Sequence, residues 1–214
     1  METLRITEIF YSLQGETRTV GLPTVFVRLT GCPLRCQYCD TSYAFQGGEQ
    51  IGLDEILNRV AELKPRYVTV TGGEPLAQKA CWNLLTHLCD AGYQVSLETG
   101  GMKDISAIDS RVVRVVDIKT PDSGEVDKNK YSNIQHLTVN DQVKFVLCSE
   151  QDYVWAKQIM NEYKLSNCCG DILFSPSHGQ LDGRSLADWI LRDHLPVRLQ
   201  LQLHKILWGD EPGK

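Results

Sequence analysis

The stretch TVFVRLTGCPLRCQYCD, residues 24–40, joins an apolar segment to a loop that carries three cysteines. Its first part, Thr24–Leu29, is mostly apolar and rich in β-branched side chains, which is typical of a strand covered on both faces. The loop Gly31–Asp40 follows directly. Because the chemistry of a parallel sheet gathers at the carboxyl ends of its strands, we expect this strand to lead into a functional loop.

The rest of the chain alternates between strand-like and helix-like patterns. Short apolar runs predict further strands at Tyr67–Thr71, Gln94–Glu98, Val113–Ile118, Val143–Leu147, Ile172–Ser175 and Val197–Leu203. Apolar residues at helical spacing predict helices at Leu53–Leu63, Lys79–Ala91, Glu150–Tyr163 and Arg184–Arg192. The polar segment Thr120–Asn133 is predicted to be a surface loop. Strands that alternate with helices predict an α/β fold with a parallel sheet.

The length of the chain favours a partial barrel over a closed one. The chain has 214 residues, whereas a closed barrel of eight strand–helix units typically takes about 250. We therefore expect a single domain over residues 1–214. Its sheet should be an incomplete β/α barrel of about six parallel strands.

The composition excludes several classes of protein. Lys and Arg number 22 against 27 Asp and Glu, and the resulting net charge of −5 argues against a protein that grips nucleic acid. No apolar run approaches the roughly 18 residues of a membrane span, so we expect no membrane association. The start METLRITEIF lacks the pattern of a secretory signal, which favours a cytoplasmic protein. In that reducing compartment, closely spaced cysteines indicate a metal or cofactor site rather than disulfides.

The cysteines Cys32, Cys36 and Cys39 follow the spacing Cys-x3-Cys-x2-Cys. Thiolates at this spacing can converge on zinc or on an iron–sulfur cluster. A structural zinc site takes four ligands, usually from two paired motifs, and the chain has no second Cys-x2-Cys. A [4Fe–4S] cluster on three cysteines leaves one iron free to bind a small chelating molecule. The alternatives are a zinc-binding module and a ferredoxin-like electron carrier, although the carrier needs four cysteines on its cluster.

The remaining cysteines share no spacing with this loop. We expect them to be buried free thiols that pack as small apolar residues. They are Cys81, Cys89, Cys148, Cys168 and Cys169.

The cysteine loop resembles that of the radical S-adenosylmethionine (SAM) superfamily, in which an aromatic residue such as Tyr38 precedes the last cysteine. The segment TGGEP, residues 71–75, resembles the turn that contacts the amino group of SAM in that superfamily. The chain resembles the 7-carboxy-7-deazaguanine synthase family in particular. The segments that carry this resemblance include EIFYSLQGE (8–16), CDT (39–41), ETGG (98–101), DIKTP (117–121) and QLHK (202–205).

This resemblance implies a particular reaction. Cys32, Cys36 and Cys39 would ligate a [4Fe–4S] cluster, whose open iron would chelate SAM. One electron would then cleave SAM to methionine and a 5′-deoxyadenosyl radical. The radical would abstract a hydrogen atom from 6-carboxy-5,6,7,8-tetrahydropterin. Ring contraction with loss of ammonia would give 7-carboxy-7-deazaguanine, an intermediate toward queuosine, with the cofactor supplying the difficult chemistry.

The resemblance also implies roles for individual residues. The residues expected to contact SAM are Tyr38, Cys39, Asp40, Gly73, Asp117, Ile118, Lys119, Ser175, Pro176, Ser177 and His178. Those expected to contact the substrate are Leu13, Gln14, Gly15, Arg28 and Thr71. Thr41 would be a ligand of Mg²⁺, which prefers hard oxygen donors. The implied partners are an electron donor such as a flavodoxin and a second copy of the chain in a homodimer.

Some of these residues also have a structural interpretation. A buried arginine needs a carboxylate partner, so Arg28 binds either the substrate or an internal acid, Glu16 or Glu74. Thr41 is alternatively a helix-capping residue.

Three further points stay open at this stage. Lys119 alternatively forms an ion pair with Asp117 or Glu98. In some members of the family the last residue contacts the substrate; Asp210 holds that position here, and the chain continues beyond it. A radical SAM activase, which shares the cysteine spacing, is the alternative enzyme, but it needs a groove for a protein loop rather than a closed pocket with Arg28 and Thr41.

Overall fold

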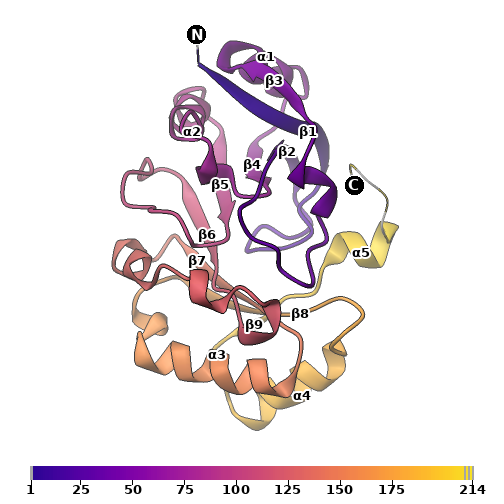
Figure 1. Cartoon of the computed structure of the whole chain (residues 1–214), viewed down its shortest axis with the longest axis vertical. Coiled ribbons are helices and arrows are strands. Elements are labelled where there is room, and N and C mark those ends of the chain that lie inside the picture. Colours follow the sequence, from indigo (N-terminus) through magenta and orange to yellow (C-terminus); the bar gives the residue numbers. More distant parts are fainter. Residues whose placement is uncertain (1, 210, 212, 214) are drawn as a thin grey trace.

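The computed structural model of the protein describes residues 2–209, 211 and 213, and its strands form one sheet (Figure 1). The strand order is β3-β1-β2-β4-β5-β6-β7-β8-β9. The strands are β1 (Thr3–Leu13), β2 (Pro23–Leu29), β3 (Glu49–Gly52), β4 (Tyr67–Gly72), β5 (Gln94–Thr99), β6 (Val113–Asp117), β7 (Gln142–Leu147), β8 (Asp171–Pro176) and β9 (Arg198–Leu199). Neighbours from β2 to β9 are parallel, whereas β1 and β3 pair antiparallel at one edge.

This sheet confirms the predicted α/β class and an open barrel. The parallel part has the six expected strands and the two-residue β9. Within the described residues β3 and β9 each have one neighbour, so the sheet does not close. The cysteine loop and α5 lie to one side of the curved sheet in Figure 1, while α1 to α4 lie around its outside.

Of the five α-helices in the described residues, four were predicted, and their observed ends differ from the predicted ones by at most two residues. The helices are α1 (Leu53–Glu62), α2 (Cys81–Asp90), α3 (Glu150–Glu162), α4 (Gly183–Arg192) and α5 (Leu203–Trp208). Side-chain caps fix the starts of two of them, because Ser149 accepts from the Asp152 amide and Asp182 from the Ser185 amide. None of the helices in the described part of the chain is long and apolar enough to cross a membrane.

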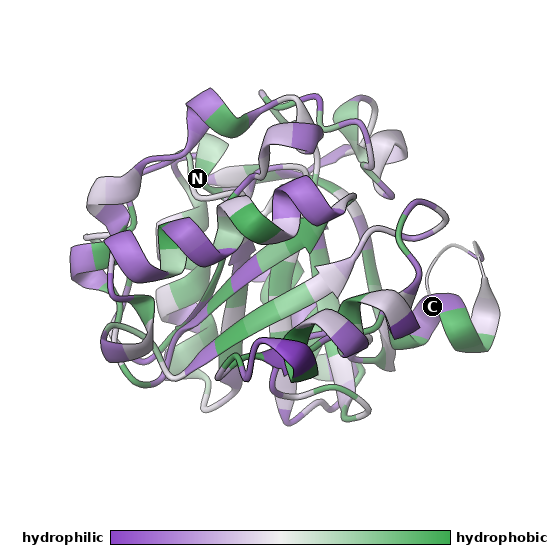
Figure 2. Cartoon of the chain, turned by 90° about the horizontal axis from the view of Figure 1, so that it is seen from below, coloured by the Kyte–Doolittle hydropathy of each residue, from purple (hydrophilic) through white to green (hydrophobic). Residues whose placement is uncertain are grey.

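Apolar side chains pack in two clusters between the sheet and these helices. One cluster joins β2, β4 and β5 to α1 and α2, and the other joins β7 and β8 to α3 and α4. Tyr153 of α3 and Phe145 and Phe174 of the neighbouring strands form edge-to-face contacts in the second cluster. Figure 2 shows largely apolar strands behind helices in which polar and apolar residues alternate. Burial of these faces is the main favourable contribution to folding.

The prediction of a strand over Val197–Leu203 is wrong for most of its length. Only Arg198 and Leu199 pair with β8, and α5 begins at Leu203. The reason is a competing set of polar contacts. The Leu203 amide donates to the Gly15 carbonyl at 2.9 Å, and the Gln202 side chain turns towards Glu16.

The segment Thr120–Asn133 was predicted to be a surface loop, and most of its residues are exposed or half-buried, but it is more ordered than expected. It contains short 3₁₀-helices, and Thr120, Ser123 and Asn133 are buried. Their polar groups are satisfied internally, since the Thr120 hydroxyl donates to Asp152 at 2.9 Å and the Asn133 amide to the Gly101 carbonyl at 2.9 Å.

The five cysteines outside the loop are free thiols, as predicted. Cys81, Cys89 and Cys169 are buried. Cys148 and Cys168 are only half-buried, contrary to the expectation.

A buried ion pair holds the start of β7 against β6. Asp141 is 1% exposed and accepts from the Arg114 amide, from its guanidinium and from Thr138. We predict that Asp141→Ala lowers the free energy of unfolding by about 3–5 kcal/mol, because it leaves the Arg114 charge buried and unpaired. Asp104→Ala removes a surface pair with Lys130 and serves as the control. Urea unfolding measures both, and an equal small effect of the two substitutions would contradict the prediction.

Candidate active site

A cavity of about 610 Å³ opens at the carboxyl ends of the parallel strands. It is lined by the cysteine loop, by the ends of β1, β2 and β4 to β7, and by α5. The predicted site residues in this lining are Leu13, Gln14, Gly15, Arg28, Cys32, Cys36, Tyr38, Cys39, Asp40, Thr41, Thr71, Gly73, Asp117, Lys119, Ser177 and His178. The fold thus brings together residues that are up to 165 positions apart, from Leu13 to His178.

Three predicted site residues lie outside this lining. Ile118 packs in the apolar cluster around β7 and α3, because its side chain points away from that of Asp117. Ser175 and Pro176 are buried at the end of β8, where they pair with β7. Asp210 lies outside the described residues.

The cysteine loop is held in place by backbone and arginine contacts. Gly31 has φ of +95°, and its amide donates to the Ala44 carbonyl at 2.8 Å. The Arg35 guanidinium donates to the carbonyls of Cys32 and Leu34 at 2.6 and 2.7 Å and lies 4.4 Å from the centre of the Phe45 ring. These contacts fix the loop so that its thiols face the cavity.

The glycine turn after β4 packs directly against this loop. A Cβ atom at Gly73 would lie 2.3 Å from the Gly31 carbonyl oxygen and 2.7 Å from the Cys32 Cβ. Only glycine therefore allows this close approach. The Glu74 amide donates to the same Gly31 carbonyl at 2.9 Å, which ties the turn to the cysteine loop.

Glu74 itself is fully buried and joins two strand ends. Its carboxylate accepts from the Leu76 amide, the Thr99 hydroxyl and the Gly100 amide at 2.8–3.0 Å. Burial raises the pKa of Glu74, although these hydrogen bonds act against the rise. Its side chain is thus used to hold β4 beside β5.

The residues present fit an iron–sulfur cluster with SAM beside it. All three cysteines of the loop are free, partly accessible and in the cavity lining. Burial raises the pKa of the Cys36 thiol to about 11, so a soft metal centre that binds this sulfur would stabilise it as a thiolate. The Tyr38 hydroxyl and Asp117 Oδ1 are buried without a hydrogen-bond partner among the described residues. Such atoms are suited to meeting a polar ligand.

Ion pairs run across the floor of the cavity. Lys119 donates to Asp117 at 2.9 Å, in agreement with one of the two pairings considered above. Lys144 donates to Glu16 at 2.5 Å and lies 4.0 Å from Asp117. Burial acts to lower the pKa of both lysines, but the adjacent carboxylates outweigh it and raise those pKa values. Both lysines therefore remain charged.

Arg28 has a different internal partner from either one considered from the sequence. Its Nε donates to Glu8 at 2.7 Å, not to Glu16 or Glu74. Glu8 lies directly opposite Arg28 on β1.

Glu98 and Lys144 are cavity residues that the sequence analysis did not assign. The Gln14 side chain donates to Thr69 and Glu98 at 3.2 and 3.3 Å, and Thr71 donates to Glu98 at 3.2 Å. Both missed residues are charged side chains on interior strands of the sheet, Glu98 on β5 and Lys144 on the mostly apolar β7, and this is the signal that could have found them. A charged side chain on a covered strand needs a partner or a ligand.

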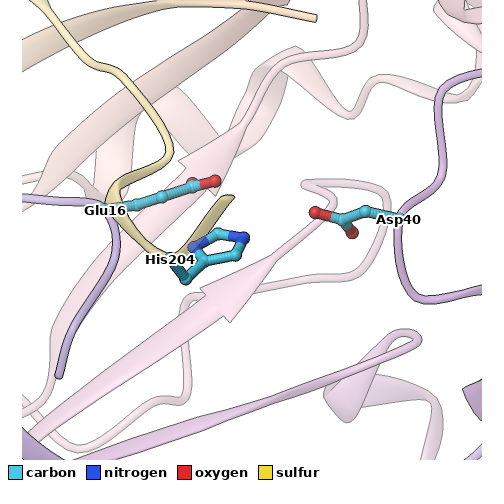
Figure 3. Close-up of side chains that lie close together, drawn as sticks. All are labelled: Glu16, Asp40 and His204. Carbon is cyan, nitrogen blue, oxygen red and sulfur yellow. The ribbon is translucent and has the colours of Figure 1, made fainter. Parts of the chain in front are cut away.

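Glu16, Asp40 and His204 lie close together near the entry of α5 (Figure 3). One ligand atom from each lies within 4.8 Å of the others, so the trio can approach a metal ion. Gln202 already donates to both carboxylates, at 2.8 Å to Glu16 and 3.0 Å to Asp40. Burial lowers the pKa of His204. The sequence analysis quoted the segment of His204 but did not assign this residue.

Thr41 lies beside this group. Its hydroxyl donates to Asp40 Oδ1 at 3.0 Å, and it makes no side-chain capping bond to the 3₁₀-helix that follows. Burial acts to raise the pKa of Asp40, but Lys144 and the Thr41 hydroxyl outweigh it and lower the pKa. Asp40 is therefore ionised, and the donors around Thr41 are hard oxygens of the kind that Mg²⁺ prefers.

A parallel α/β sheet that presents three cysteines to a central cavity is the architecture of a radical SAM enzyme. The sequence model described as the Radical SAM superfamily matches residues 26–116, which include the cysteine loop and the glycine turn.

The relatives define the family more narrowly. The chain is 46% identical to the 7-carboxy-7-deazaguanine synthase of Chlorobaculum tepidum, over 97% of this chain and 96% of that protein. It is 40% identical to the 7-carboxy-7-deazaguanine synthase of Koribacter versatilis, over 97% and 98% of the two chains. The chain therefore belongs to the 7-carboxy-7-deazaguanine synthase family. The crystal structure of QueE from Escherichia coli has a similar fold, with a TM-score of 0.77, 20% identity and 94% coverage of both chains.

The protonation of Glu98 gives the fold a testable pH dependence. Burial raises the pKa of Glu98, although Lys144 acts against the rise. The folded protein thus holds a proton that the unfolded chain releases above the ordinary glutamic acid pKa of about 4.3. This contribution to stability is fully present below that value and is lost as the pH rises through the raised pKa.

We predict that Glu98→Gln removes this contribution to the pH dependence. Urea unfolding of both proteins between about pH 4 and pH 8 measures it, and the stability of the wild type should fall relative to the variant as the pH rises. Glu55→Gln, on the exposed face of α1, should keep the wild-type profile. A constant difference between wild type and Glu98→Gln across this range would contradict the assignment.

Proposed function

We propose that this enzyme converts 6-carboxy-5,6,7,8-tetrahydropterin to 7-carboxy-7-deazaguanine, with loss of ammonia, in the cavity described above. The observation that carries the proposal is that the cysteine loop and Arg28 face the same space of about 610 Å³. A [4Fe–4S] cluster with bound SAM supplies hydrogen-atom abstraction through reductive cleavage of SAM. The side chains of the protein bind and orient the two small molecules and limit their contact with water.

On the substrate side, Arg28 and a polar wall offer contacts to a carboxypterin. Neither Nη atom of Arg28 has a hydrogen-bond partner among the described residues, so both can donate to one carboxylate. Gln14 lies in the lining beside Glu98 and Thr71; its Nε2 donates to Thr69 and Glu98, and its Oε1 accepts from the Glu16 amide and keeps one lone pair. This set complements the N–H and C=O groups along the edge of a pterin ring. Leu13 and Gly15 flank Gln14 in the lining.

On the cofactor side, the contacts come from several strand ends. Gly73 brings the turn after β4 against the cysteine loop, and the unpartnered oxygens of Tyr38 and Asp117 can bond to polar groups of SAM. Lys119 balances the charge of Asp117. Ser177 and His178, which follow β8, complete this part of the lining, as do Cys39 and Asp40 of the loop.

Thr41 is proposed as the protein ligand of Mg²⁺. Because its hydroxyl proton is directed at Asp40, its lone pairs remain available to a cation. One neutral oxygen binds Mg²⁺ weakly, so binding should depend on further oxygen ligands from the substrate.

The partners and location are also proposals. An apolar strip of Leu199, Leu201, Ile206 and Leu207 lies exposed along β9 and α5, with Ile206 65% exposed. Because β9 is an edge strand, we propose that this strip forms the contact of a homodimer. The family resemblance supports a flavodoxin-type electron donor and a cytoplasmic location.

The proposed reaction is tested by anaerobic incubation of the reconstituted enzyme with SAM, dithionite and 6-carboxy-5,6,7,8-tetrahydropterin. We expect 7-carboxy-7-deazaguanine and 5′-deoxyadenosine by mass spectrometry. Cys36→Ala should abolish both products and lower the iron content, because the cluster loses one of its three ligands. Cys168→Ala removes a thiol outside the cavity and should change neither. Continued formation of 5′-deoxyadenosine by Cys36→Ala would refute the cluster assignment.

Removal of Mg²⁺ tests the role of Thr41. Chelation should slow turnover more than it weakens SAM binding, because the ion is proposed to hold the substrate rather than SAM. Thr41→Val should lose the response of the rate to added Mg²⁺, and Thr41→Ser should retain it because the hydroxyl is kept. If Thr41→Val responds to Mg²⁺ like the wild type, Thr41 is not a ligand.

A further inference from the structure

Glu8 faces Arg28 because of an irregularity in the first two strands. Ile6 pairs with Leu29, and Glu8 pairs with Arg28, so β1 has one extra residue at this point. Regular antiparallel pairing would place Thr7 opposite Arg28. A β-bulge of this kind redirects a side chain, and here it places a carboxylate beside a cavity cation.

The contacts of Glu8 fix the guanidinium of Arg28. Glu8 Oε1 accepts from Arg28 Nε at 2.7 Å and from the Tyr43 hydroxyl at 2.8 Å. The guanidinium carbon lies 5.8 Å from the centre of the Phe10 ring and 5.9 Å from that of Tyr43. The side chains of Arg28 and Glu8 are only 15% and 22% exposed. The Nε edge of the guanidinium is therefore occupied, and the two Nη atoms are left for a ligand.

Another acid in the cavity competes for the same cation. Asp40 lines the same space as Arg28, and its carboxylate accepts hydrogen bonds from Thr41 and Gln202. Without an anchor at Nε, a flexible arginine would turn to this carboxylate and leave the position from which it meets a ligand.

We propose that Glu8 is a positioning residue that holds Arg28 with its two Nη atoms directed at a carboxylate ligand in the cavity. This inference rests on the proposed function, in which that ligand is the carboxylate of the pterin. Removal of the Glu8 charge has two opposed effects. It weakens the anchor that holds Arg28, and it takes away a negative charge that repels the carboxylate of the ligand. Loss of the anchor dominates, since the neighbouring Asp40 carboxylate attracts the freed guanidinium.

The test compares two unreactive pterins that differ only in the carboxylate. The dissociation constants of 6-carboxypterin and pterin are measured anaerobically with the reconstituted, SAM-bound enzyme. The wild type should prefer 6-carboxypterin by at least about tenfold, as expected for charge-assisted hydrogen bonds. Glu8→Gln should lose about tenfold of this preference while its affinity for pterin stays unchanged.

Two further variants make the result decisive. Glu55→Gln breaks a similar pair with Arg59 Nε (2.8 Å) far from the cavity and should keep the full preference. Tyr43→Phe removes the second hydrogen-bond donor to Glu8 at an exposed position. This variant should lose about threefold of the preference for 6-carboxypterin, as expected for one hydrogen bond. If Glu8→Gln does not fold, Tyr43→Phe decides alone.

The possible failures are distinguishable. A wild type with no preference for 6-carboxypterin would refute the role of Arg28 in the proposed function, and the inference with it. A wild type with the preference and a Glu8→Gln that keeps it would refute the inference alone. An equal loss of affinity for both pterins would show that Glu8 supports the fold, which also overturns the inference.

Discussion

The contact between the glycine turn after β4 and the cysteine loop after β2 holds the site together. Gly73 approaches Gly31 so closely that no side chain fits between them, and the Glu74 amide bonds to the Gly31 carbonyl. The Glu74 side chain extends this link to the end of β5 through Thr99 and Gly100. Three strand ends are thereby fixed relative to one another, and the thiols of the loop face the same space as the polar wall of the cavity.

Charge balance is the second constraint on this cavity. Arg28, Lys119 and Lys144 are each paired with a carboxylate, as expected for charges withdrawn from water. Atoms not used in these pairs include the Arg28 Nη atoms and Asp117 Oδ1. The internal pairs hold the side chains in position, and the remaining atoms are the ones available to substrate and cofactor.

Much of the fold could be predicted from the sequence, because the apolar runs of β2 and β4 to β8 and the periodicity of α1 to α4 are local patterns. The turn after β9 could not be predicted, because the conformation at Gln202 depends on a contact with Glu16, 186 positions away. The buried positions of Thr120 and Asn133 within a mostly exposed segment were missed for the same reason, since their polar groups bond to distant partners. Most of the site residues expected from the family resemblance lie in the cavity, but the partner of Arg28 depended on a bulge that no sequence pattern marks.

The contacts of Gln202 and Leu203 with the segment of Gly15 and Glu16 have a consequence for how the protein becomes functional. Contacts between residues so far apart in the sequence have a high entropic cost of loop closure, so we expect them to form late in folding. Neither apolar cluster of the sheet contains Gln202, Leu203 or His204, so both clusters can pack without these contacts. We therefore expect the wall of the cavity that α5 forms to be completed after the sheet and its covering helices have packed.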